Sequence, residues 1–260
     1  MARARRVAAR RVAVVTGAGS AAGIGFAAAA LLAERGWAVA ISSTTARIHA
    51  RVRALGARGA EAAGAIADLC DPRSARALVE LALERFGRVD AVVNNAGMGR
   101  VGAPEVVKPF AALTLEEWRE SLETNLLTAV NVTRAALPAL RRSGAGRVVN
   151  VASVTGPLVA NPGESPYAAG KAALVGLTHT LALELARAGV TANAVAPGWI
   201  ATAASTPAEL RAARATPPGR AGTPREVAEV IAFLCSEGAA YVNGAVIVVD
   251  GGNALVERKA

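Results

Sequence analysis

The sequence has 260 residues, of which 53% are hydrophobic and 19% are charged. This composition excludes wholesale disorder and suits one large α/β domain or two small ones. The net charge is +9, but five arginines lie within the first eleven residues, so the rest of the chain has an ordinary charge. Both cysteines and both histidines are isolated in the sequence, which argues against a disulfide scaffold and against a metal site.

The basic start of the chain, residues 1–10, is expected to be a flexible and solvated tail. It has no apolar stretch of the kind found in secretory signals, and a strand is expected to begin by Val12, which leaves too little chain for a transit peptide. A basic tail can contact nucleic acid or a membrane surface, but we expect neither partner. No apolar run approaches the ~18–20 residues needed to cross a bilayer, so we expect a cytoplasmic protein.

Short apolar runs alternate with helical patterns along the chain. Strands are expected at Arg11–Thr16, Ala38–Ser42, Ala63–Ala67, Val89–Val93, Arg147–Val151, Val190–Ala196 and Ala245–Val249. Helices are expected at Ile24–Arg35, Ala46–Leu55, Ser74–Phe86 with Ser74 as its N-cap, from Thr114 onward, and at Tyr167–Arg187 and Pro224–Cys235. Because the strand runs are apolar throughout, the pattern predicts a parallel sheet covered by helices on both faces, a doubly wound α/β fold. No linker divides the chain, so one domain is expected over residues 11–260.

Two stretches follow strand ends and resist assignment. Met98–Leu113 is punctuated by glycine and proline, and Trp199–Thr223 contains a short helical piece at Ala208–Ala215. Ligands bind beyond the carboxyl ends of the strands in open α/β sheets. Both stretches are therefore expected to be walls or lids of a ligand site.

A glycine-rich loop, Thr16–Gly25, joins the first expected strand to the first expected helix. Glycines allow the backbone to approach a pyrophosphate closely, and the helix N-terminus attracts its negative charge. A plain tight turn is the alternative, but the position of the loop favours dinucleotide binding. The chain has no Gly-Lys-Ser/Thr sequence, which argues against a nucleoside triphosphate loop.

The second strand ends without an acidic residue, where a dinucleotide fold usually has a carboxylate for the ribose 2′-hydroxyl. Ser43, Thr44, Thr45 and Arg47 stand there instead. Hydroxyls and a guanidinium suit a 2′-phosphate, so the sequence predicts a preference for NADP(H) over NAD(H). The hydroxyls could also cap the next helix.

Tyr167 and Lys171 are four residues apart on an expected helix and therefore share one face. A tyrosine hydroxyl is a poor acid–base group at neutral pH unless a cation lowers its pKa, and we expect the Lys171 ammonium to do so. Ser153 follows a strand end at the same edge of the sheet, where its hydroxyl can hydrogen-bond a substrate oxygen.

Together these motifs resemble the short-chain dehydrogenase/reductase family. The resemblance rests on Thr16-Gly17…Gly23-Ile24-Gly25, Asn94-Asn95-Ala96-Gly97, Asn125, Ser153, Tyr167-Ala-Ala-Gly-Lys171, Pro197-Gly198 and Asp250-Gly251-Gly252. It covers the chain after the basic tail and implies a three-layer Rossmann-type fold with seven parallel strands. The glycine loop is two residues longer than is usual in this family, around Gly19, Ser20 and Ala21.

The resemblance implies a nicotinamide cofactor and a catalytic tetrad. Tyr167 would be the acid in reduction, Lys171 would lower its pKa and hold the nicotinamide ribose, Ser153 would polarise the carbonyl, and Asn125 would anchor a water that relays protons to Lys171. Cofactor contacts are expected from Gly17, Gly19, Ser20, Gly23, Ile24, Gly25, Ser43, Thr44, Thr45, Arg47, Asp68, Leu69, Asn95, Ala96, Gly97, Pro197, Gly198, Ile200 and Thr202, besides Tyr167 and Lys171.

The expected activity is the NADPH-dependent reduction of a ketone to a secondary alcohol. A 3-oxoacyl-[acyl-carrier-protein] reductase is the alternative, with Arg141, Arg142, Arg147 and Arg187 as candidate contacts to an acidic carrier protein. However, Ala188 stands where the carrier-protein enzymes of this family tend to have arginine. A non-catalytic dinucleotide sensor is the remaining alternative. The resemblance also implies a homotetramer.

Overall fold

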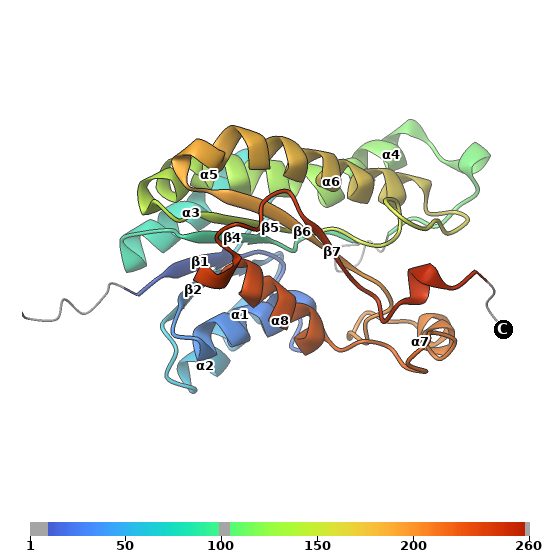
Figure 1. The fold of residues 1–260 in the computed structure, drawn as a ribbon, viewed down its shortest axis with the longest axis horizontal. Helices are drawn as coiled ribbons and strands as arrows, with labels where there is room; N and C mark the ends of the chain where they lie inside the picture. Colours follow the sequence, from blue (N-terminus) through green and yellow to red (C-terminus); the bar gives the residue numbers. More distant parts are fainter. Residues whose placement is uncertain (1–9, 99–104, 258–260) are drawn as a thin grey trace, which may run out of the picture.

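A single parallel sheet of seven strands organises the computed structural model, which describes residues 10–98 and 105–257 (Figure 1). The strands are β1 (Val12–Val15), β2 (Ala38–Ser43), β3 (Ala62–Ile66), β4 (Ala91–Asn94), β5 (Arg147–Val151), β6 (Thr191–Pro197) and β7 (Val246–Val249). Their order in the sheet is β3-β2-β1-β4-β5-β6-β7, and every neighbouring pair is parallel. The expected fold class is confirmed.

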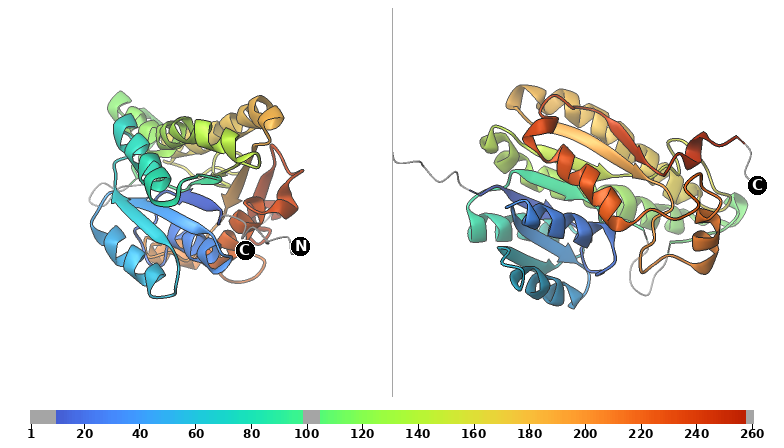
Figure 2. Two further views of the ribbon diagram at one scale, coloured as in Figure 1. Left: turned by 90° about the vertical axis from the view of Figure 1, so that its left-hand side faces the viewer. Right: turned by 60° about the horizontal axis from the view of Figure 1, so that its bottom comes forward.

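Helices cover both faces of the sheet (Figures 1 and 2). They are α1 (Ile24–Glu34), α2 (Arg47–Gly56), α3 (Pro72–Phe86), α4 (Leu115–Leu122), α5 (Thr128–Ser143), α6 (Ser165–Leu185), α7 (Pro207–Ala213) and α8 (Pro224–Leu234). One core cluster packs α1, α2 and α8 against the sheet, and another packs α3, α5 and α6 against its other face. The strands alternate between these clusters, so that Val15 points into one and Val14 into the other, as the pleat requires.

The order of the strands reverses at β1, which pairs with β2 on one side and β4 on the other. In an open α/β sheet such a switch point creates a crevice outside the carboxyl ends of the strands. The sequence motifs at Thr16–Gly25 and Asn94–Gly97 both fall there, since the first follows β1 and the second begins with the last residue of β4. The fold therefore places both motifs beside this crevice.

Short helical segments occupy the regions between the main elements. They are η1 (Phe110–Ala112), η2 (Glu123–Leu127), η3 (Ala186–Ala188), η4 (Glu237–Ala239) and η5 (Asn253–Leu255), of which η2 is a π-helical turn between α4 and α5. The unassigned stretch Met98–Leu113 contains η1, although residues 99–104 lie outside the described residues. The stretch Trp199–Thr223 contains α7, one residue ahead of the expected position.

The helix cap expected from the sequence is present at α4 but not at α3. Thr114 caps α4 in a capping box with Glu117, as expected. The expectation that Ser74 caps the third helix is wrong: Asp71 is the N-cap and accepts from the Arg73 amide at 3.0 Å. Pro72 then occupies the first helical position, where its missing N–H costs nothing, so Ser74 lies inside the helix and donates to Asp71.

Of the expected basic tail, residues 1–9 lie outside the described residues, and Arg10 forms an exposed ion pair with Glu61 at 2.9 Å. Within residues 10–98 and 105–257, no helix is both long and apolar enough to cross a membrane.

The amino ends of β1 and β4 are joined by a buried carboxylate. Asp90 accepts from the Val12 amide at 2.9 Å and from both ends of the Arg88 guanidinium fork, at 2.8 and 2.7 Å. Its side chain is 3% exposed. Hydrogen bonding to Asp90 raises the pKa of Arg88, so the guanidinium keeps its charge in this contact.

We expect Asp90→Ala to lower the free energy of unfolding by about 2–3 kcal/mol, because it leaves the buried Val12 amide and the Arg88 guanidinium without their acceptor. Urea unfolding measures the change. Glu61→Ala is the control, since it removes an exposed ion pair and should leave the midpoint nearly unchanged. Equal midpoints for Asp90→Ala and wild type would contradict this account of the β1–β4 junction.

Candidate functional site

The glycine loop runs from β1 to α1 and leaves no space for side chains at its glycines. Gly17 has a φ of +67°, and a Cβ added to Gly25 would lie 2.7 Å from the Gly17 carbonyl oxygen. The Gly23 amide donates to the Ser20 carbonyl at 3.3 Å, which forms a turn with Ala21 and Ala22 exposed at its tip. The two extra residues of this loop are thus accommodated in a solvent-facing turn.

The N-terminus of α1 is suited to a phosphate group. Gly23 is its N-cap and offers no side-chain hydrogen bond, and the first turn, which contains Ile24 and Gly25, has no acidic residue. The first N–H groups of a helix lack partners within the helix and favour an anion. This end of α1 can therefore hold the pyrophosphate of a dinucleotide with backbone donors alone.

Asn95 fixes the loop to the end of β4. Its side-chain amide donates to the carbonyl oxygens of Thr16 and Gly17, at 3.0 and 3.1 Å. The Thr16 hydroxyl in turn accepts from the backbone amides of Asn95 and Ala96, both at 2.9 Å. The Asn95 side chain thus joins the glycine loop after β1 to the segment after β4 by hydrogen bonds.

Ser43 and Arg47 lie next to the glycine loop, beside Gly19. Ser43 Cβ and Oγ would lie 2.7 and 2.9 Å from a Cβ placed on Gly19, and a terminal nitrogen of Arg47 would lie 3.8 Å from it. The Arg47 side chain is exposed, and its Nε donates to the Thr45 hydroxyl at 3.1 Å. A guanidinium beside hydroxyls at this position can receive a phosphate group.

The alternative that these hydroxyls cap the next helix is wrong. The N-cap of α2 is Ala46, and no side chain caps this helix. Ser43 Oγ instead donates to the Thr45 carbonyl at 2.8 Å and accepts from the Thr45 amide at 3.2 Å, while Thr44 is exposed. The hydroxyl cluster is a turn of its own between β2 and α2.

The other expected cofactor residues lie at the same carboxyl edge. Asp68 is exposed just after β3, whereas the Leu69 side chain is buried beneath α3, so only its backbone can reach a ligand. Thr202 is held in a turn, because its amide donates to the Ser205 hydroxyl at 2.9 Å. Pro197, Gly198 and Ile200 follow the end of β6.

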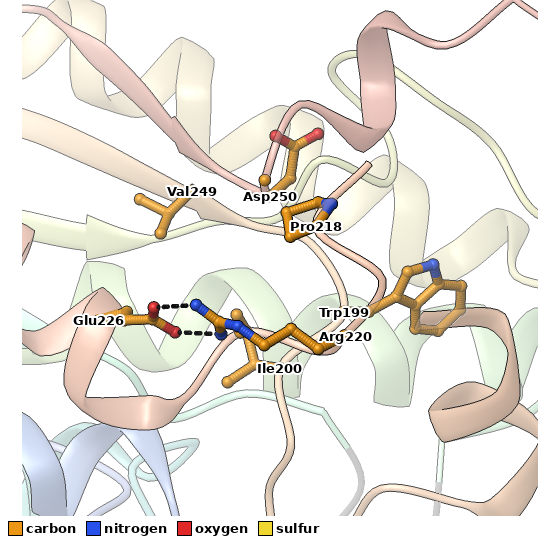
Figure 3. A pocket seen from close by; sticks show the side chains of 9 residues that line it. Trp199, Ile200, Pro218, Arg220, Glu226, Val249 and Asp250 are labelled. Carbon is orange, nitrogen blue, oxygen red and sulfur yellow. Dashed lines mark hydrogen bonds and ion pairs between the residues drawn. The ribbon is translucent and has the colours of Figure 1, made fainter. Parts of the chain in front are cut away.

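A hollow of about 140 Å³ lies beside Ile200 at the ends of β6 and β7 (Figure 3). Trp199, Pro218, Arg220, Glu226 and Asp250 are among the residues that line it. Arg220 and Glu226 form a two-point ion pair across one wall, at 3.0 and 2.7 Å. The hollow borders the expected cofactor residues but does not include the expected tetrad. In residues 10–98 and 105–257, no group of three or more His, Cys, Asp or Glu side chains is placed to hold a metal ion.

The expected tetrad converges from three directions on the end of β4. Lys171, on α6, is 3% exposed and donates from Nζ to the Val151 carbonyl at the end of β5, at 3.2 Å. A Cβ added to Gly97 would lie 2.9 Å from Lys171 Nζ and 3.2 Å from Asn125 Oδ1. Gly97 therefore separates the ammonium from the amide, and any larger residue there would disturb both.

Tyr167 and Ser153 complete this convergence. Lys171 Nζ lies 5.6 Å from the centre of the Tyr167 ring, one helical turn earlier. Ser153 is 8% exposed, and its Oγ accepts from the Thr155 amide at 3.1 Å, which leaves its proton available to another acceptor. The structure thus brings all four sequence-predicted residues to one place.

Lys171 was expected to lower the pKa of Tyr167, but the net change in this structure is a rise. Burial raises the pKa of Tyr167 to about 12; the Ser153 hydroxyl opposes this rise, and the carboxylates of Glu164, Glu105 and Glu209 add to it. Burial also lowers the pKa of Lys171 to about 8, while the charge of Glu105 raises it. The low polarity of the site disfavours the charged form of both groups.

Asn125 lies in the π-helical turn η2 and is fully buried, with its side chain hydrogen-bonded at both ends. Its Oδ1 accepts from the Met98 amide at 2.8 Å, and its Nδ2 donates to Glu105 at 3.0 Å and to the Ser121 carbonyl at 3.1 Å. Sequence reasoning missed Ser121, Glu105 and the π-turn. The helix from Thr114 gave no sign of a bulge, and Glu105 stands in a stretch without periodic pattern.

Comparisons with known proteins agree with this arrangement. A family model described as "Enoyl-(Acyl carrier protein) reductase" matches residues 17–254. A cis-4-hydroxycyclohexanecarboxylate dehydrogenase of Sinomonas cyclohexanicum is 41% identical over 95% of this chain and 98% of that protein. A 3-oxoacyl-[acyl-carrier-protein] reductase, FabG, of Vibrio cholerae is 39% identical over the same shares of the two chains.

Solved structures show the same likeness. The crystal structure of levodione reductase superimposes with a TM-score of 0.87 at 34% identity, covering 95% of this chain and 98% of that one. A variant of actinorhodin polyketide ketoreductase, solved with NADPH, gives a TM-score of 0.86 at 36% identity, with the same coverage. The chain belongs to the short-chain dehydrogenase/reductase family. It is an oxidoreductase acting on CH–OH and C=O groups, and its family binds a nicotinamide dinucleotide.

We expect Gly25→Ala to lower the free energy of unfolding by about 1–3 kcal/mol and to weaken dinucleotide binding, because the added methyl group clashes with the Gly17 carbonyl and cannot move away. Urea unfolding and fluorescence titration with NADPH measure the two effects. Gly176→Ala is the matched control. Nothing lies within 4 Å of a Cβ at Gly176, in the middle of α6, so alanine should stabilise the helix by ~0.5–1 kcal/mol. Unchanged stability and binding in Gly25→Ala would contradict the packing argument.

Proposed function

We propose that the chain is an NADPH-dependent carbonyl reductase that reduces a ketone to a secondary alcohol. The observation that supports this best is that Ser153, Tyr167, Lys171 and Asn125 lie together at the carboxyl edge of the sheet, with Lys171 and Asn125 bordering Gly97. A dinucleotide sensor has no need of a buried lysine beneath a half-buried tyrosine and a serine whose proton is available.

In this proposal Tyr167 is the general acid. Its phenol is protonated at neutral pH, so that it has a proton to give to the oxygen of the substrate carbonyl. Ser153 donates a second hydrogen bond to that oxygen and stabilises the negative charge that develops on it. Lys171 holds a positive charge beneath Tyr167, and it can bind the nicotinamide ribose as well. The role of Asn125 as a water anchor stays a prediction.

The residues that would hold the cofactor fit a phosphorylated dinucleotide. The uncapped N-terminus of α1 would hold the pyrophosphate, and Ser43, Thr45 and Arg47 would hold the 2′-phosphate. When bound, a reduced nicotinamide supplies the hydride that the substrate carbon receives. The protein chain contributes position and the proton.

A free ketone is the proposed substrate, and an acyl-carrier-protein thioester is the second candidate. The identity to FabG of Vibrio cholerae favours the second. However, Arg147 is 3% exposed within β5 and cannot contact a partner, so that expectation is wrong. Arg141, Arg142 and Arg187 are exposed, but they precede β5 and β6 and therefore lie at the sheet edge opposite to Tyr167. A carrier protein bound on them would not face Tyr167 of the same chain.

Two further expectations stand as proposals. We propose that residues 11–260 form one domain, because the sheet is continuous and the two core clusters share its strands. We also propose a homotetramer. Exposed apolar side chains at Leu183, Tyr241 and Leu255 would be covered by other copies of the chain.

We expect Tyr167→Phe to lower ketone reduction by NADPH ~10²–10⁴-fold, since it removes the proposed proton donor. Nicotinamide absorbance measures turnover over a panel of ketones and alcohols with both cofactors. Tyr241→Phe is the matched control, because Tyr241 is the other tyrosine of the sequence and is fully exposed. NADPH affinity should be the same in wild type and both variants. Near-normal turnover in Tyr167→Phe would refute the proposed role.

We expect NADPH to be preferred over NADH, and Ser43→Asp to reverse this preference by repelling the 2′-phosphate. Arg47→Ala should weaken NADPH binding roughly ten- to a hundredfold, the worth of one charge-assisted contact, and should leave NADH binding unchanged. Arg53→Ala, in the last turn of the same helix and exposed, is the control. Comparison of kcat/KM for both cofactors decides. A wild-type preference for NADH would contradict the role proposed for this turn.

A further inference from the structure

Glu105 places a carboxylate against the buried face of the proposed site. One oxygen accepts from Asn125 Nδ2 at 3.0 Å, and the other accepts from the Ser121 hydroxyl. Ser121 Oγ also accepts from Asn125 Nδ2 at 3.3 Å, so the three side chains form a closed set of hydrogen bonds. Ser121 is 6% exposed and Asn125 is fully buried, which protects these contacts from water.

This set, together with the Ser121 carbonyl and the Met98 amide, fixes which way the Asn125 amide points. A carboxylate accepts hydrogen bonds and has none to donate, so the NH2 group must face Glu105. The amide oxygen then faces the Met98 amide at 2.8 Å and the space beside Gly97. Lys171 Nζ borders the same space from the other side.

Glu105 also supplies negative charge close to a buried ammonium. Lys171 is 3% exposed and has one hydrogen bond, to the Val151 carbonyl, among the described residues. Tyr167 faces it from the same helix, Asn125 is the neutral neighbour from η2, and of the described residues Glu105 is the one whose charge acts on it. Burial lowers the pKa of Lys171 to about 8, and Glu105 limits that fall. Without the carboxylate, the pKa of Lys171 would fall further below its ordinary value.

We propose that Glu105 is a positioning residue for the site: its carboxylate orients the Asn125 amide, and its negative charge stabilises the Lys171 ammonium, which borders Gly97 opposite that amide. This inference rests on the proposed function of the tetrad. It adds a residue from outside that tetrad, on the segment between β4 and α4.

The sequence makes a direct test possible, because Lys108, Lys171 and Lys259 are its three lysines. Protein labelled with 13C at lysine Cε gives few signals, and the loss of one of them in Lys171→Ala assigns Lys171. We would titrate this signal in full-length protein without cofactor or substrate. We expect Glu105→Gln to lower the midpoint of Lys171 by roughly 1 pH unit.

Three further variants separate the possible causes. Glu116→Gln removes an exposed carboxylate of α4 that does not contact the site, and should leave the midpoint unchanged. Ser121→Ala removes a hydrogen bond but no charge, so its midpoint should move less than that of Glu105→Gln. Glu105→Asp retains the charge and should restore most of the wild-type value, which keeps the proposal testable if Glu105→Gln does not fold.

Ketone turnover against pH is the second measurement. The alkaline limb of kcat should move to lower pH in Glu105→Gln by about the shift seen for Lys171, with KM for the ketone changed less than kcat. A Lys171 midpoint in Glu105→Gln equal to that of wild type overturns the proposal, whatever the turnover. If wild type reduces no ketone while Lys171 shifts as expected, the electrostatic link stands and the proposed function fails.

Discussion

The hydrogen bonds between the carboxyl ends of β1 and β4 determine the geometry of the whole site. Thr16 and Asn95 provide the side chains for five of them, three through the Thr16 hydroxyl and two through the Asn95 amide. The glycine loop before α1 and the segment Asn95–Gly97 after β4 are therefore held together by hydrogen bonds. Because these strands are adjacent at the switch point of the sheet, a ligand that spans it touches both halves of the fold.

The second constraint is the burial of Lys171. A buried ammonium is costly unless other groups compensate for its lost hydration. The Val151 carbonyl, the Asn125–Glu105 pair and the Tyr167 ring surround it with partial or full negative charge. Gly97 is required beside them because a Cβ there would fill the space that the Lys171 and Asn125 side chains share. Close packing also requires glycine on α6, next to the π-turn η2. Asn125 lies in this turn, and a Cβ added to Gly170 would be 3.0 Å from the Asn125 Cβ.

Sequence patterns predicted the sheet, its parallel direction and the meeting of Ser153, Tyr167 and Lys171, because each depends on periodicity or on position after a strand end. The place of Asn125 was predicted only by the resemblance to the family. The patterns failed for two different reasons. Asp71 rather than Ser74 caps α3 because of a local preference, since Pro72 fits the first helical turn. The other failures come from contacts between segments. Glu105 and Ser121 carry no signature of their own, since their importance comes from Asn125 lying between them.

The order in which the site loses protons is also invisible in the sequence. In free side chains tyrosine has a slightly lower pKa than lysine, 10.0 against 10.5, so it is the first to lose its proton. Burial here places Tyr167 at about 12 and Lys171 at about 8, which inverts that order. An ammonium can assist a phenol only while it is charged, so the useful pH range of the pair ends at the pKa of the lysine. The carboxylates that raise the pKa of Tyr167 favour its protonated form, which is the form needed for reduction. Glu105 acts on both Tyr167 and Lys171, and its negative charge raises the pKa of each.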